Sequence, residues 1–173
     1  SGGKFKIYLP EDALPGMYRI YWNNNIPEGI DFIFNKENFR FKTHKDSLLS
    51  ALQILESEEN ELLYSFLPLK IAIDQFMSLG DRLNREDPFN NKPALIEINN
   101  YIDSLEFRAY KLLAEIDENS KNKLAYKVLK AGFYPNYEIH LKMGGNEYSN
   151  AYEFMQKHFF DNLDFNEPNL IRT

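Results

Sequence analysis

The 173-residue chain contains no cysteine. This absence excludes disulfide bonds, cysteine-ligated zinc, iron–sulfur clusters and thiol nucleophiles. It also gives no sign of an oxidising compartment, so we expect the protein in the cytoplasm. The three histidines, His44, His140 and His158, show no zinc-motif spacing. We therefore expect neither a metal nor a cofactor.

Positive charge is also scarce, since 20 Lys and Arg face 26 Asp and Glu, for a net charge of −6. Such a surface repels a phosphate backbone, so we expect no DNA or RNA polymer as a partner. No apolar run approaches the ~20 residues of a membrane span, so no membrane segment is expected. The glycine-rich phosphate loops and the serine-hydrolase elbow are missing. We therefore expect no enzyme.

Apolar and aromatic residues are abundant, at 43% and 15% of the chain. A chain of this length and composition can bury one core, and we expect a single domain over residues 4–173. The small residues 1–3 are read as a remnant of cloning.

The beginning of the chain shows strand patterns. Phe5, Ile7 and Leu9 alternate with polar residues, which predicts a half-buried strand. Residues 32–34 and 39–43 flank a polar loop, which predicts a hairpin. The segment 18–22 fits a strand or a helix.

Helical spacing dominates the middle of the chain. It predicts a helix from about Asp46 to Leu62, with the acidic run 56–61 facing outward. Pro68 is predicted to open a second helix, and Pro93 a third that reaches Ile116.

The end of the chain combines both patterns. Ser120 is predicted to cap a short helix that Gly132 closes. Alternation over 137–143 predicts a strand, and spacing over 152–159 predicts a terminal helix. The fold class expected is α+β (or α/β): a small sheet of N-terminal strands and a hairpin, three to four central helices, a late strand and a C-terminal helix.

Two patterns suggest chemistry without fixing it. Glu138, His140 and Lys142 would share one strand face, as in metal-dependent nucleases, but the spacing fits the polar face of an edge strand better. The front of the chain interleaves Arg19 with Tyr18, Tyr21 and Trp22, and Arg40 with Phe39 and Phe41. Rings stack on bases and guanidinium groups bind phosphate, so this part suits a nucleotide; core aromatics beside a surface arginine are the alternative.

In their order, these segments resemble the cyclic-dinucleotide-binding domain of the bacterial STING family. The resemblance lies in residues 5–12, in the hairpin 35–43 at the place of the family's lid, and in residues 63–69 at its pocket floor. It implies a non-catalytic receptor that binds a cyclic dinucleotide at a homodimer cleft and triggers an antiviral effector. Arg40 would bind phosphate with help from Arg19, while Ser65 contacts a base and Tyr64 lines the floor.

The chain departs from the family at two points. Ser65 stands where the family carries an aspartate that reads a guanine edge, and the family's long N-terminal dimer helix is not present. The alternative function is a protein–protein interaction module that docks a partner through the aromatics of residues 17–22, without a small-molecule ligand. An enzyme would be considered if Glu138, His140 and a further acidic side chain converged in a pocket.

Overall fold

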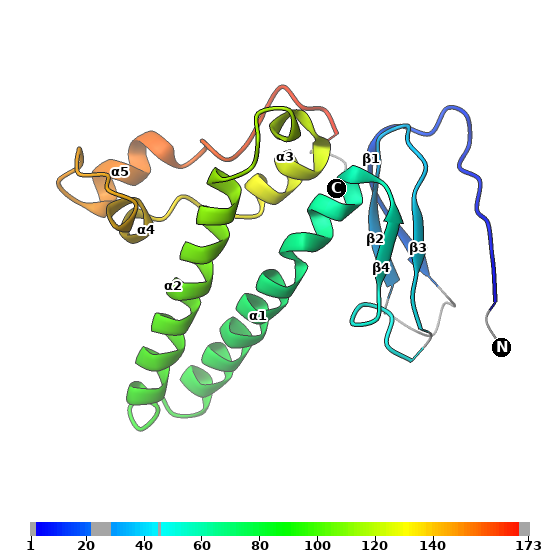
Figure 1. The fold of residues 1–173 in the computed structure, drawn as a ribbon. Helices are drawn as coiled ribbons and strands as arrows, with labels where there is room; N and C mark the ends of the chain where they lie inside the picture. Colours follow the sequence, from blue (N-terminus) through cyan, green and yellow to red (C-terminus); the bar gives the residue numbers. More distant parts are fainter. Residues whose placement is uncertain (1–2, 22–28, 45, 170–173) are drawn as a thin grey trace.

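Two small antiparallel sheets and five α-helices form the described part of the chain, which confirms the α+β class (Figure 1). The computed structural model describes residues 3–21, 29–44 and 46–169. The strands are β1 (Gly16–Tyr21), β2 (Gly29–Phe34), β3 (Arg40–Lys42) and β4 (Gln53–Glu56). The helices are α1 (Glu58–Glu86), α2 (Lys92–Ala114), α3 (Leu124–Ala131), α4 (Tyr137–Lys142) and α5 (Ala151–His158).

The first sheet is the hairpin of β1 and β2, with Tyr21 opposite Gly29 and Gly16 opposite Phe34. The segment that fitted a strand or a helix is therefore β1, up to Tyr21. Trp22 lies outside the described residues. Ile30 and Ile33 of β2 are fully buried, and Ile33 packs with Leu124 and Ala125 of α3.

The predicted hairpin between residues 32–34 and 39–43 is wrong. β2 pairs with β1, and β3 pairs instead with β4, which comes later in the chain. Phe32 and Phe39 stack with their ring centroids 5.1 Å apart, so the two sheets meet through aromatic side chains. The alternating pattern was correct for each strand but carried no information about its partner.

The predicted strand over Phe5 to Leu9 is also wrong. Residues 3–10 are neither strand nor helix and join neither of the two described sheets. Phe5, Ile7 and Tyr8 are more than half exposed. Alternation gives a strand only where a neighbouring strand accepts its hydrogen bonds.

Two helix boundaries differ from the prediction. Residues 46–51 form turns and lead into β4, so no helix begins near Asp46. The helix starts at Glu58, where the Ser57 hydroxyl accepts from the Asn60 N–H at 3.1 Å. Pro68 opens no second helix, because it lies inside α1 on an exposed position.

α1 and α2 form an antiparallel helical hairpin, and its connected ends project away from the other elements (Figure 1). The third predicted helix is confirmed as α2, with Pro93 in its first turn. Leu69 and Ile73 of α1 pack with Leu105 and Ala109 of α2. A short 3-10 turn (Ser120–Asn122) then leads to α3. The N-cap of α3 is Lys123, so the prediction of Ser120 was wrong, and its C-cap is Gly132, as predicted.

The strand predicted over 137–143 is helix α4. The Asn136 side chain accepts hydrogen bonds from the N–H groups of Glu138 and Ile139, which caps the helix. Six residues of alternation also fit a short helix, and the cap decides between the two. The terminal helix is confirmed as α5.

By length and composition alone, α1 is apolar enough to cross a membrane, although no unbroken apolar run suggested it. Only 17% of its apolar stretch is buried. Lys70 and Asp74 lie midway along the helix and form an ion pair across one turn at 2.9 Å.

Candidate functional site

Arg19 and Tyr64, two of the predicted ligand-binding residues, meet at Asp31. Arg19 of β1 lies opposite Asp31 of β2, and its guanidinium donates two hydrogen bonds to the carboxylate. The Tyr64 hydroxyl of α1 donates to the Asp31 backbone carbonyl at 2.5 Å. The bond to Asp31 raises the pKa of Arg19, and burial raises the pKa of Tyr64. Both groups therefore keep their protons at any ordinary pH.

Arg40, the predicted phosphate ligand, lies on the other sheet. Its Nε is 3.1 Å from Oε2 of Glu56, the residue opposite it in β4. The Arg40 side chain is 66% exposed. Two surface hollows are lined by other parts of the chain, one by residues between Pro10 and Tyr18 and one by residues between Asp74 and Arg82.

Ser65, the predicted base contact, is exposed on α1, and its hydroxyl donates to the Leu62 carbonyl at 2.7 Å. Successive helical residues differ in direction by about 100°, so Ser65 does not share the direction of Tyr64. The described contacts thus join Arg19 with Tyr64 and join neither Arg40 nor Ser65 to them.

The aromatic side chains near the start of the chain pack against one another in a row and do not form a cluster open to solvent. Tyr18 packs edge-on against Phe34 and lies beside Phe32, which stacks on Phe39. The hydroxyl of Tyr18 donates to the Leu14 carbonyl at 2.7 Å. These contacts use the rings for packing, and Tyr21 alone among the described aromatics of residues 17–22 is an exposed large side chain.

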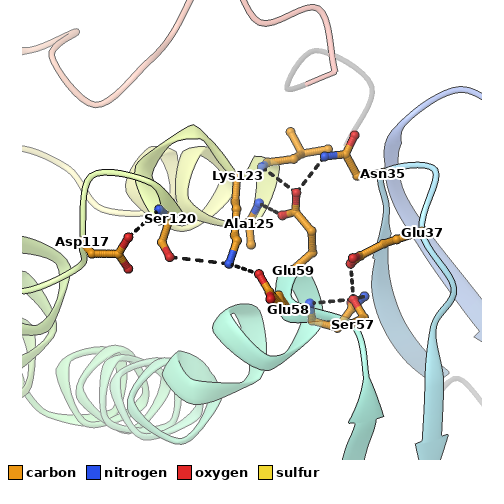
Figure 2. Close-up of polar contacts among 11 residues, drawn as sticks. Asn35, Glu37, Ser57, Glu58, Glu59, Asp117, Ser120, Lys123 and Ala125 are labelled. Atoms are coloured by element: carbon orange, nitrogen blue, oxygen red, sulfur yellow. Dashed lines mark hydrogen bonds and ion pairs between the residues drawn. The ribbon is translucent and has the colours of Figure 1, made fainter.

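The sequence did not identify Glu59 as a structural residue, because the whole acidic run 56–61 was predicted to face outward. Its side chain is buried, with the residue only 4% exposed. The carboxylate accepts from the backbone N–H groups of Leu124 at 3.1 Å and Ala125 at 2.6 Å, and from the Asn35 amide at 2.7 Å (Figure 2). It therefore caps the start of α3 from α1, as a negative charge at a helix N-terminus does.

Asn60 fixes β2 to the start of α1. Its amide accepts from the Ile33 N–H at 2.8 Å and donates to the Ile33 carbonyl at 2.9 Å, so it pairs with the strand as another backbone would. It also donates to the Ser57 hydroxyl. That hydroxyl in turn donates to Glu37, as Figure 2 shows. Ser57 adopts φ 121°, a region that non-glycine residues rarely occupy. This network holds β2, the loop that follows it and α3 on one helix end.

His140 and His158 come together on the Phe154 ring, with centroids at 4.9 and 4.7 Å. The His158 ring bonds to Asp161 and, at 2.7 Å, to the Tyr148 hydroxyl. His140 Nε2 is 3.3 Å from the Glu147 carboxylate. Across residues 3–21, 29–44 and 46–169, no three His, Asp or Glu side chains are placed to hold a metal ion.

The nuclease arrangement is overturned by the helical form of α4. Glu138, His140 and Lys142 shared a face only as a strand, and two-residue steps on a helix point about 200° apart. His44 lies 3.8 Å from Asp46 at the surface, where no helix begins.

A stripe of small and apolar residues follows one side of α1, at alternating steps of four and three residues. The α1 stripe consists of Ser65, Leu69, Ala72, Phe76, Leu79 and Leu83. This spacing is that of helices that pack side by side in bundles. Leu69 is buried, whereas Phe76, Leu79 and Leu83 stay partly exposed.

α2 carries a matching stripe, made of Ala94, Ile98, Tyr101, Leu105, Ala109 and Leu112. The rings of Phe76 and Tyr101 are in contact, with centroids 4.6 Å apart, which places both stripes on the same side of the hairpin. Tyr101 is 47% and Leu112 36% exposed. We call the surface formed by the two stripes the open face.

The open face is covered at one end only, where Phe133 packs on the cluster of Leu69, Leu105 and Ala109. Within residues 74–104, Ile98 is the one apolar side chain that is buried, at 8% exposure. α3 packs against Leu62 and Leu63 near the start of α1. These two residues are not part of the α1 stripe. The open face therefore leaves Tyr101 exposed and Phe76 and Leu79 partly exposed, and charged residues border it where Leu79 lines a hollow with Asp74 and Arg82.

No protein-family model, no curated protein and no solved structure matches this chain.

Proposed function

We propose that this chain is a non-catalytic protein-interaction module that binds helical segments through the open face. The observation that carries the proposal is the pair of stripes with four-and-three spacing, held side by side and left half exposed. Monomeric proteins rarely leave large contiguous apolar patches in solvent, and such patches mark interaction sites. The sequence suggested the aromatics of residues 17–22 as the contact surface, whereas the proposed surface lies on the helical hairpin.

The chemistry of the open face defines the class of partner. A helix that presents apolar residues at the same spacing can insert its side chains between those of the two stripes. Phe76 and Tyr101 lie next to each other in this surface and offer an aromatic anchor, the kind of residue on which binding energy concentrates.

A selection of displayed amphipathic helical peptides on the immobilised chain tests the proposal. Enriched peptides should carry apolar residues at four-and-three spacing and should lose binding to the Tyr101→Glu variant. Tyr152→Glu is the matched control, since Tyr152 is an exposed tyrosine on α5. Peptides that bind Tyr101→Glu equally well, or flotation of the chain with phosphatidylcholine vesicles through α1, would contradict the proposal.

The receptor for a cyclic dinucleotide is the second candidate, and the meeting of Arg19 and Tyr64 at Asp31 supports it. In that proposal a ligand phosphate would compete with Asp31 for Arg19 and with Glu56 for Arg40, while Ser65 contacts a base. A saturating ligand, at 100 times its dissociation constant, would add about 2.7 kcal/mol to the unfolding free energy. Thermal unfolding with a panel of cyclic dinucleotides, repeated with Arg19→Ala and Arg40→Ala, tests it; an unchanged melting temperature with every ligand contradicts it.

A further inference from the structure

We propose that β1 accepts a third strand at its outer edge. An extended peptide of another protein adds along Met17, Arg19 and Tyr21 and places a lysine or arginine in a hollow at the start of β1. This binding surface lies on a sheet, whereas the open face lies on the helical hairpin, so it goes beyond the proposed function. Two observations carry it: the direction of the main-chain groups of β1, and the hollow beside them.

The hydrogen bonds of β2 show which main-chain groups of β1 point outward. Ile33 of β2 donates its N–H to the Asn60 amide at 2.8 Å, so it cannot donate to Met17, the residue opposite it in β1. In an antiparallel pair, opposite residues alternate between exchanging both hydrogen bonds and exchanging neither. The residues of β1 whose N–H and C=O groups point away from β2 are therefore Met17, Arg19 and Tyr21.

The outer edge of β1 lacks the protection that the other strands have. The side chains of Asn60 and Tyr64 cover the outer edge of β2. β3 and β4 have only three and four residues, and their register shifts next to Arg40. Short strands, bulges and charges keep edges from pairing with other chains. β1 has six residues, and the charge of its Arg19 is neutralised by Asp31.

The outward main-chain groups of β1 define the class of partner. In the described part of the chain, β2 is the one helix or strand that lies along β1. The hydrogen bonds between described residues use neither the outward N–H nor the outward C=O of Met17 and Arg19. An extended backbone presents donors and acceptors at the same two-residue spacing, whereas a helix bonds its own main-chain groups. The edge therefore fits an extended peptide, as in other domains that recognise peptides by strand addition.

The hollow at the start of β1 adds a preference for one side chain of the peptide. Its volume is about 490 Å³, and its lining consists of residue 10 and residues 12–18, most of them apolar. Asp12 is the one charged residue of this lining. Lys36 donates to the Ala13 carbonyl from outside the lining. Lysine and arginine combine an apolar stem with a cationic end, so they match apolar walls that carry one carboxylate.

A selection of displayed linear peptides on the immobilised chain tests the proposal. Peptides of about nine residues are too short for a stable helix in water. Met17→Pro removes one outward N–H, and proline is tolerated in an edge strand where the N–H faces solvent. Enriched peptides should bind Met17→Pro about fivefold more weakly than Met17→Leu, which keeps both the N–H and an apolar side chain.

The hollow has its own pair of variants. Enriched peptides should carry a lysine or arginine at one position, and Asp12→Asn should weaken their binding about threefold. Glu11→Gln is the matched control, since Glu11 is exposed and lies outside the lining. Equal effects of the two variants would contradict a side chain bound beside Asp12.

N-methylation of an enriched peptide gives a readout that does not depend on the folding of a variant. Every second N–H of an added strand points to its neighbour. N-methyl groups on one set of alternate residues should therefore weaken binding at least about tenfold, and those on the other set should not. Bound peptide should also slow the amide exchange of Met17 and Arg19.

Three outcomes would overturn the proposal. One is a selection that enriches no peptide, and another is a peptide that tolerates N-methylation at every residue. The third is a peptide that loses its affinity for Tyr101→Glu and keeps it for Met17→Pro. That result would place the peptide on the open face and so leave the proposed function in place.

Discussion

At the scale of single residues, the buried carboxylate of Glu59 joins three parts of the fold. Replacement by alanine leaves two N–H groups of α3 and the Asn35 amide without their acceptor. The two N–H groups are buried, and each unsatisfied buried donor costs ~1–3 kcal/mol, so Glu59→Ala should lower the unfolding free energy by about 2–6 kcal/mol. Urea unfolding at neutral pH measures this loss.

The neighbouring Glu58 is the matched control for that measurement. Its side chain is mostly exposed and pairs with Lys123 at 2.7 Å (Figure 2). An exposed ion pair contributes less than ~1 kcal/mol, so Glu58→Ala should stay close to the natural stability. Equal losses in the two variants would show that Glu59 does not act through its buried hydrogen bonds.

The half-buried phenol of Tyr110 gives a prediction for stability at alkaline pH. Burial raises the pKa of Tyr110 to about 12, and its hydroxyl donates to the Tyr134 carbonyl. Since this pKa is higher in the folded state, the proton stabilises the fold below pH ~10, and that contribution is lost as pH rises through 12. Absorbance titration should show one late-ionising tyrosine fewer in Tyr110→Phe. An unchanged number of late phenols would contradict this assignment.

At the scale of elements, α1 carries a proline in its interior. Pro68 cannot donate to the Tyr64 carbonyl four residues earlier, and its ring crowds that turn. Pro68 is exposed, so alanine loses little packing there. We expect Pro68→Ala to raise the unfolding free energy by about 1–2 kcal/mol, after the gain in chain entropy of the unfolded state is subtracted. Thermal unfolding checks this; a lower melting temperature would mean that the fold requires a bend at this position.

Long periodic segments were predictable from the sequence, and short ones were not. The apolar stripe that follows Pro93 extends over six helical turns. A helix is the regular structure that places so many residues with this spacing on one side. Residues 137–142 offer too few positions to separate a strand from a helix, and Asn136 decides through its cap. β2 and β3 were predicted as strands, but their partners follow from contacts that alternation does not encode.

The candidate site was less predictable than the fold, because it depends on contacts between residues that are far apart in the sequence. Glu59 is buried because α3 begins beside it, although Leu124 is 65 residues away in the sequence. Arg19 was selected for its aromatic neighbours, yet its partner Asp31 lies on the next strand. Apolar periodicity in α1 and α2 was visible in the sequence, but Tyr101 was not part of it, and its exposure depends on how few elements pack on the hairpin.

At the scale of the whole molecule, a helix bound to the open face would couple the stability of the fold to the concentration of that partner. A ligand that binds only the folded chain, at 100 times its dissociation constant, adds about 2.7 kcal/mol to the unfolding free energy. A peptide selected on the natural sequence should therefore raise its melting temperature by about 5–11 °C, since 1 kcal/mol corresponds to about 2–4 °C for a chain of this size. Tyr152→Glu should show the same rise, and Tyr101→Glu should not. Scanning calorimetry measures all three. An equal rise in Tyr101→Glu would contradict binding at the open face, because a partner that packs on the Tyr101 ring must lose affinity when a charge replaces it.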